Sequence, residues 1–93
     1  MPAAVRFGDY CAGHCFEARP NDQASPNFFI NGLGVHRVTD HWPTHSCPPA
    51  SHDSNQAEGS PNFFVNGSAV ARVGDKLSCG DVTAQGSPNF FVN

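Results

Sequence analysis

The chain has 93 residues, a formal net charge of −3 and no basic cluster, so its electrostatics disfavour binding to nucleic acid. Eight Phe, nine Gly and eight Pro favour short strands and turns over helices. At this length we expect one all-β domain, 1–93, with a thin core that a metal or a partner would supplement. The sequence has neither a stretch long enough for a membrane span nor a basic and apolar leader, so we expect a protein made in the cytoplasm.

One seven-residue peptide, Ser-Pro-Asn-Phe-Phe-(Val/Ile)-Asn, occurs three times, at 25–31, 60–66 and 87–93. The first predicted element in the chain, 1–9, has the sequence of a return strand that follows such a peptide, yet no copy precedes it. It aligns without a gap on 67–75 when Asn93 is aligned with Asn66. We therefore expect the two chain ends to pair with each other.

The next predicted elements are two complete hairpins. In the first, Asn31-Gly32 joins the repeat to a return strand over 35–38, and in the second, Asn66-Gly67 joins 63–65 to 69–73. Asn-Gly between apolar runs predicts a type I′ turn, because both residues of that turn need positive φ. With the chain ends forming a third hairpin, we expect three similar units to close into a ring with three-fold pseudosymmetry.

Each return strand ends in an Arg followed three residues later by an Asp, and each repeat holds two adjacent Phe. We expect each Asp to cap its loop by accepting backbone N–H bonds and to pair with its Arg. The pairs are Arg6 with Asp9, Arg37 with Asp40 and Arg72 with Asp75. Because side chains alternate between the two faces of a strand, we expect one Phe of each pair in the core and the other at an interface.

The loops that follow the three Asp residues carry candidate metal ligands. At the same loop position they present His14, His45 and Cys79. Three such ligands around a pseudo-three-fold axis match a tetrahedral zinc or ferrous site that needs one further ligand on the axis. We favour His52 as this ligand, because the loop of the second unit is long enough to fold back over the axis. Cys47 is the main alternative, since thiolate binds zinc well.

The other histidines, cysteines and the single Trp are assigned ordinary roles. His36 and His41 are expected to be solvated or hydrogen-bonded surface groups, and Trp42 is expected to pack over the longer loop. In the absence of a secretory leader, we expect free thiols at the remaining cysteines, Cys11, Cys15 and Cys47.

The segments 2–9 and 69–75, each joined to a Gly-Ser-Pro-Asn-Phe-Phe-Val-Asn type strand, resemble the proline-alanine-alanine-arginine (PAAR) repeat proteins. The resemblance covers essentially the whole chain, and it is greatest to small stand-alone members from contractile-tailed bacteriophages and type VI secretion clusters. This chain departs from the family pattern in having Thr39 for a Gly, His36 for an Ala, and an intact Pro-Ala pair only at Pro2-Ala3.

The resemblance implies a conical β-structure with its base on a trimeric β-helical spike, one chain per trimer, and a metal at its apex. Three His and one Cys bind that metal in the family, and carried onto this chain they are His14, His45, His52 and Cys79. Zinc is the expected metal, with iron as the alternative.

The implied function is structural rather than enzymatic: a tip that sharpens the spike of a phage tail or a type VI secretion system. It meets the target membrane transiently as it pierces the envelope, either as a virion component or delivered through the machine. A small metal-dependent hydrolase or an effector is the alternative. We disfavour the hydrolase, because four protein ligands saturate a tetrahedral zinc and leave no position for water.

Overall fold

The computed structural model describes residues 1–13, 17–47 and 50–93, and it describes the side chains of these residues except over 44–53. Within these ranges the chain is all-β, without a helix, as the composition predicted. Three antiparallel pairs of strands are formed. The strands are β1 (Phe29–Ile30), β2 (Leu33–Gly34), β3 (His41–Cys47), β4 (Ala50–Asn55), β5 (Phe64–Val65) and β6 (Ser68–Ala69).

The hairpins β1–β2 and β5–β6 are the two predicted from the Asn-Gly pairs, although their strands are shorter than expected. Asn31 and Gly32 have φ of 55° and 79°, and Asn66 and Gly67 have φ of 54° and 79°. Positive φ at both central residues identifies the type I′ turn, whose twist matches that of the flanking strands.

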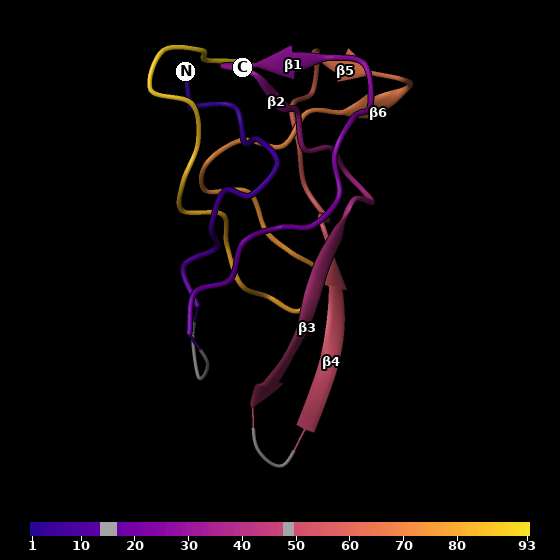
Figure 1. Ribbon diagram of the computed structural model, residues 1–93, viewed down its shortest axis with the longest axis vertical. Helices are drawn as coiled ribbons and strands as arrows, with labels where there is room; N and C mark the ends of the chain where they lie inside the picture. The colour runs from indigo at the N-terminus through magenta and orange to yellow at the C-terminus, as the bar shows by residue number, and fades with distance from the viewer. Residues whose placement is uncertain (14–16, 48–49) are drawn as a thin grey trace.

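The two chain ends lie side by side and pair in the predicted register (Figure 1). Ala3 and Phe91 form an antiparallel bridge, and the amide of Ala4 donates to the carbonyl of Phe90 at 3.0 Å. The complete hairpins contain the same bond, from Val35 to Phe28 and from Val70 to Phe63, both at 3.0 Å. The N-terminal residues therefore act as the return strand of the third copy of the repeat.

The extra residues of the second unit form a long hairpin, β3–β4, which was not predicted from the sequence. We expected a loop folded back over an axis, whereas the hairpin projects away from the end that carries both termini, β1–β2 and β5–β6 (Figure 1). Its register shifts between Trp42 and His45, on either side of Pro43, because proline has no N–H to donate to the ladder. We call its end of the molecule the hairpin end, and the opposite end the wide end.

The molecule is elongated, with extents of 37 × 23 × 22 Å, and its described side chains form two apolar clusters. The larger one gathers small and branched side chains from all three copies of the repeat and their return strands: Ala4, Ile30, Val35, Val65, Val70 and Val92. The smaller one lies nearer the hairpin end and consists of Cys11, Trp42 and Leu77, with Cys79 packed against it. Trp42 thus lies in the core rather than over a loop.

Three backbone hydrogen bonds link the return strands in a closed cycle. Val5 donates to Ala71, Ala71 to His36, and His36 to Val5, each at 2.9 Å. His36 is consequently fully buried, and the expectation that it is a surface group was wrong. Its ring packs edge to face on Trp42, with 5.1 Å between centroids, and its Nδ1 donates to the carbonyl of Gln23 at 2.7 Å.

Candidate functional site

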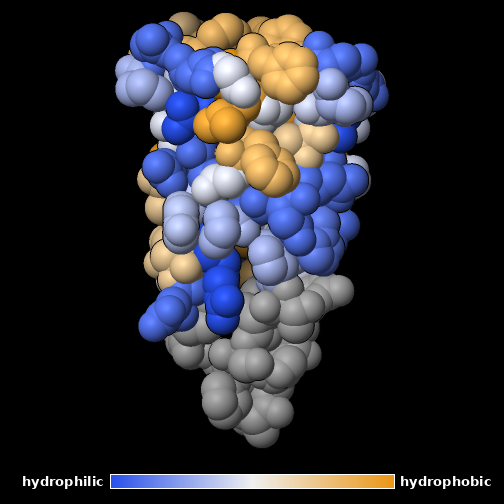
Figure 2. Space-filling model, in the orientation of Figure 1, coloured by the Kyte–Doolittle hydropathy of each residue, from blue (hydrophilic) through white to orange (hydrophobic). Residues whose placement is uncertain are grey.

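The wide end presents one exposed phenylalanine from each copy of the repeat. Phe29, Phe64 and Phe91, the second Phe of each pair, are 48 to 59% exposed, and Met1 and Leu33 are exposed as well. Figure 2 shows the resulting apolar surface in orange at this end. On one flank the structure contains a pocket of about 460 Å³ lined in part by Phe7, Phe29 and Leu33. An apolar surface of this kind marks a site of interaction.

One Phe of each pair turns inward, as the alternation predicted, and the structure shows that it is the first. Phe28, Phe63 and Phe90 pack against the larger apolar cluster. Phe63 contacts the other two edge to face, with centroids 6.0 and 6.1 Å apart. The inner phenylalanines therefore hold together the strands that present the outer ones.

Beneath this surface each return strand ends in an arginine clamp. In the first, Arg6 donates through Nε and Nη2 to the two carboxylate oxygens of Asp9, both at 2.9 Å, and the Arg6 amide donates to Asp9 Oδ2 at 2.7 Å. The clamps of Arg37 on Asp40 and of Arg72 on Asp75 have the same bonds at 2.9 to 3.0 Å. Hydrogen bonding to Asp9 raises the pKa of Arg6 above its ordinary value. The predicted pairing and capping are both confirmed.

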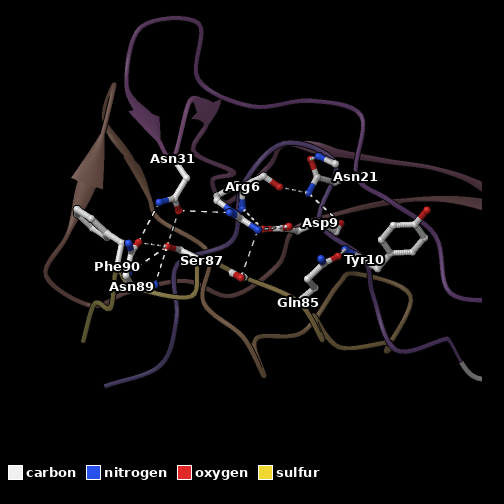
Figure 3. A network of polar contacts seen from close by, with 11 residues as sticks. Arg6, Asp9, Tyr10, Asn21, Asn31, Gln85, Ser87, Asn89 and Phe90 are labelled. Atoms are coloured by element: carbon white, nitrogen blue, oxygen red, sulfur yellow. Dashed lines mark hydrogen bonds and ion pairs between the residues drawn. The ribbon is translucent and has the colours of Figure 1, made fainter.

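Two asparagines of the Asn-Gly turns tie neighbouring copies of the repeat together, and we call each such contact an Asn clip. Asn31 accepts from Ser87 Oγ at 2.6 Å and from Arg6 Nη1 at 3.2 Å, and its Nδ2 donates to Asn89 Oδ1 at 2.9 Å (Figure 3). Asn66 makes the equivalent bonds to Ser25, Arg37 and Asn27, at 2.8, 2.9 and 3.0 Å. The Ser and the two Asn of the repeated peptide are thus explained by contacts between copies.

A third set of side chains was missed in the sequence. Gln23, Glu58 and Gln85 each accept, through Oε1, the amide of the residue that follows a clamped Asp; the three donors are His41, Lys76 and Tyr10, at 2.9 to 3.1 Å. Figure 3 shows one of these bonds, between Gln85 and Tyr10. Each acceptor lies two residues before the Ser of a repeat, so extending the repeat alignment toward the N-terminus would have found them.

Near the hairpin end, the turn that contains Cys79 is fixed against β4 and against the first loop. The amide of Cys79 donates to Ser54 Oγ at 3.2 Å, and the amide of Gly13 donates to Asp81 Oδ2 at 2.9 Å. Cys79 is a half-buried free thiol. Cys11 is also a free thiol, as predicted, and burial raises its pKa, which disfavours the thiolate that a metal requires.

The predicted ligands differ in how far the structure describes them. His14 and Cys15 lie outside the described residues. His45 and His52 are paired across β3–β4, as are Cys47 and Ala50. The structure describes only the backbone of these four residues. Among the described residues, no group of three or more His, Cys, Asp or Glu is placed to hold a metal. The ligand set therefore remains a prediction.

His41 is half-buried with its Nδ1 2.8 Å from Asp22 Oδ1, in line with a hydrogen-bonded surface group.

In the part of the chain that the structure describes, no helix is long and apolar enough to cross a membrane.

A family model described as the PAAR motif matches residues 20–85, which is more than half of the chain. The matched region includes all six strands and Cys79. A comparison with curated proteins found no match.

Proposed function

The chain belongs to the PAAR motif family, and on that premise we propose that it caps and sharpens the tip of a trimeric β-helical spike. Proteins with this motif are spike-associated components of contractile injection systems, and the family is generally structural rather than enzymatic. In our proposal the wide end sits on the spike, one chain per trimer. The hairpin end leads as the spike, of a phage tail or a type VI secretion system, pierces an envelope.

The observation that carries the proposal is the set of exposed phenylalanines at the wide end. Phe29, Phe64 and Phe91 occupy the same position in three copies of one peptide, and their return strands are linked in a cycle of three backbone bonds. A pseudo-three-fold arrangement of this kind would offer each chain of a trimer an equivalent aromatic contact. Aromatic side chains supply much of the binding energy of protein interfaces.

Capping also meets a need of the partner. The end of a β-helix exposes unpaired backbone N–H and C=O groups, which invite edge-to-edge association, and stacked repeats need a terminal cap. The short strands around the wide end would cover those groups. The cap would therefore stabilise the end of the spike.

We further propose a metal at the hairpin end, bound by His14, His45, His52 and Cys79. The described contacts support this set: Cys79 is bonded to Ser54, two residues from His52, and Gly13, which precedes His14, is bonded to Asp81, two residues from Cys79. One thiol and three imidazoles suit zinc, with iron as the alternative. When bound, the metal would supply a structural cross-link between the three segments that carry these ligands.

Native mass spectrometry of the protein co-purified with a spike from the same cluster of genes tests the proposal. We expect a complex of one chain with three spike chains. A complex with three copies per trimer, or no complex under conditions where both proteins are folded, would contradict the capping role.

A further inference from the structure

In each of the two Asn clips an asparagine side chain fills a polar site made by a neighbouring copy of the repeat. The molecule contains a third site of the same kind, which no asparagine among the described residues fills. At each filled site a carboxamide oxygen accepts from a Ser hydroxyl and from an Arg Nη1, while the carboxamide nitrogen donates to an Asn Oδ1. By alignment of the repeats, the third site consists of Ser60, Asn62 and Arg72, and its occupant would be Asn93. We call these three residues the third corner.

The third corner has its side chains prepared in the same way. Ser60 is buried, and its hydroxyl donates to Asn62 Oδ1 at 3.2 Å and accepts the amides of Asn62 and Phe63 at 3.2 and 3.0 Å. Ser25 and Ser87 accept the same two amides within their own repeats, and their Oγ atoms also lie 3.1 Å from Asn27 Oδ1 and Asn89 Oδ1. Each has one proton, which the shorter contact to its clip Asn takes. Arg72 is held by Asp75 as Arg6 and Arg37 are held by their own aspartates.

The difference lies in the carboxamide. Among the described residues, the side chain of Asn93 bonds to no member of the third corner, and Arg72 Nη1 has no acceptor, whereas Arg6 Nη1 and Arg37 Nη1 each bond to a clip Asn. The Arg72 side chain is accordingly 23% exposed, against 12% for Arg6 and 13% for Arg37. Arg72 Nη1 is therefore left without the asparagine oxygen that its two counterparts bind.

We propose that the third corner is a docking site for a carboxamide side chain, Asn or Gln, of the partner that covers the wide end. A carboxamide has an acceptor for Arg72 and for the Ser60 hydroxyl, and a donor for Asn62 Oδ1, which takes the place of the Ser60 proton there. A carboxylate matches less well, because it would place negative oxygens against Asn62 Oδ1 and next to the Asp75 carboxylate, which already neutralises Arg72. The identity of the partner rests on the function proposed above, but the chemistry of the site does not.

The site makes docking on a three-fold partner asymmetric. Two of the three equivalent arginines are occupied by the chain's own asparagines, so only one chain of a trimeric partner can place its carboxamide on an arginine. A single polar contact of this kind is directional and would orient the cap while the apolar surface supplies non-directional contact.

Titration of the ¹⁵N-labelled protein with acetamide, followed by NMR of the side-chain N–H groups, tests the site without a spike. We expect a saturable shift of the Arg72 and Asn62 signals, with Arg6 and Arg37 unaffected, and roughly tenfold weaker binding of acetate, the change that one lost hydrogen bond produces. Asn62→Leu should abolish the shift at Arg72, whereas Asn89→Leu, the matched change at a filled clip, should leave it.

Equal shifts at all three arginines, no shift at Arg72, or acetate binding as tightly as acetamide would overturn the proposal. A shift of the Arg72 signal that appears only in Asn93→Gly would also overturn it, because the Asn93 carboxamide would then be what fills the third corner. Since this titration uses no spike, a negative result leaves the capping proposal standing, and failure to bind a spike leaves the third corner standing.

Discussion

At the scale of single residues, the arginine clamps depend on one left-handed position each. The residue before the clamped aspartate has φ of 85° at Gly8, 79° at Thr39 and 95° at Gly74. Glycine takes this conformation readily, whereas a β-branched residue is strained there. Thr39 therefore stores strain in the second unit, and the surrounding bonds of its backbone to Gln56 and Asn55 hold it in place.

Replacing Thr39 with glycine should stabilise the protein. Relief of a left-handed β-branched residue is worth about 1 kcal/mol, which for a domain of this size raises Tm by about 4–8 °C. Thermal unfolding measures the shift. Gly74→Thr is the matched control. It should lower Tm through backbone strain alone, because a Cβ at this position meets no atom within 4 Å. A lower Tm for Thr39→Gly would instead show that the Thr39 side chain stabilises its turn.

His36 should make stability depend on pH. Burial lowers the pKa of His36 below its ordinary value of 6.5, so the folded state binds the proton less readily than the unfolded chain. Stability is then retained above about pH 6.5 and decreases as the pH falls below it. His36→Val places at this position the residue found at the equivalent position of the first return strand, Val5. We expect Tm to fall less between pH 7.5 and pH 5 in this variant than in the wild-type protein. Equal falls in the variant and the wild type would refute this role of His36.

At the scale of elements, local turns form the hairpins and long-range polar side chains join them. Each Asn clip links a turn to a repeat that is 39 to 58 residues away in sequence. Each of the side chains of Gln23, Glu58 and Gln85, which we call anchors, links the start of a repeat to the residue after a clamped aspartate. Because the strands are only two residues long outside β3–β4, these side chains supply much of the connection that longer ladders provide elsewhere.

Asn31→Gly should remove one clip and preserve its turn. Glycine tolerates the positive φ of this position, while the bonds to Ser87, Asn89 and Arg6 are lost, so we expect a loss of about 1–2 kcal/mol in the free energy of unfolding. Chemical denaturation measures it. Asn93→Gly is the control, since Asn93 holds no clip, and equal losses in the two variants would contradict the asymmetry of the third corner.

The turn at Cys79 should couple metal content to stability. In Cys79→Ser we expect loss of zinc by elemental analysis together with a fall in Tm. Free metal at about 100 times Kd contributes about 2.7 kcal/mol, so the fall should be on the order of 10 °C. Wild-type protein treated with a chelator should have the same Tm as the Cys79→Ser variant. Wild-type melting that does not respond to chelation would argue against a structural metal.

At the scale of the whole molecule, the apolar residues separate into a set that holds the fold and a set that faces outward. The second Phe of each repeat is about half exposed, whereas the first packs against the larger apolar cluster. An exposed apolar surface costs solubility unless a partner covers it, so its retention in three copies is in accord with docking.

Serine at Phe29, Phe64 and Phe91 together should leave the fold intact and abolish co-purification with the spike. Their side chains are about half exposed, so Tm should change little. The matched variant, serine at Phe28, Phe63 and Phe90, should instead lower Tm strongly through cavities in the core. Retained spike binding in the first variant would refute the wide end as the docking face.

The sequence by itself determined the hairpins, their turns, the arginine clamps, and that one Phe of each pair is buried while the other faces outward. These features depend on interactions within a few residues and on alternation along a strand, and they recur with the repeat. The pairing of the chain ends also followed from the repeat, because an unpartnered return strand at one end matched an unpartnered peptide at the other.

Only the tertiary structure decided the burial of His36, the β3–β4 hairpin, the clips and anchors, and the third corner. Each depends on residues far apart in the chain, such as Tyr10 with Gln85 or Asn31 with Ser87, and a single sequence does not state which distant polar groups meet. The long hairpin was missed for a related reason: its strands are polar, so no apolar period distinguishes them from a loop, and cross-strand pairing alone forms them.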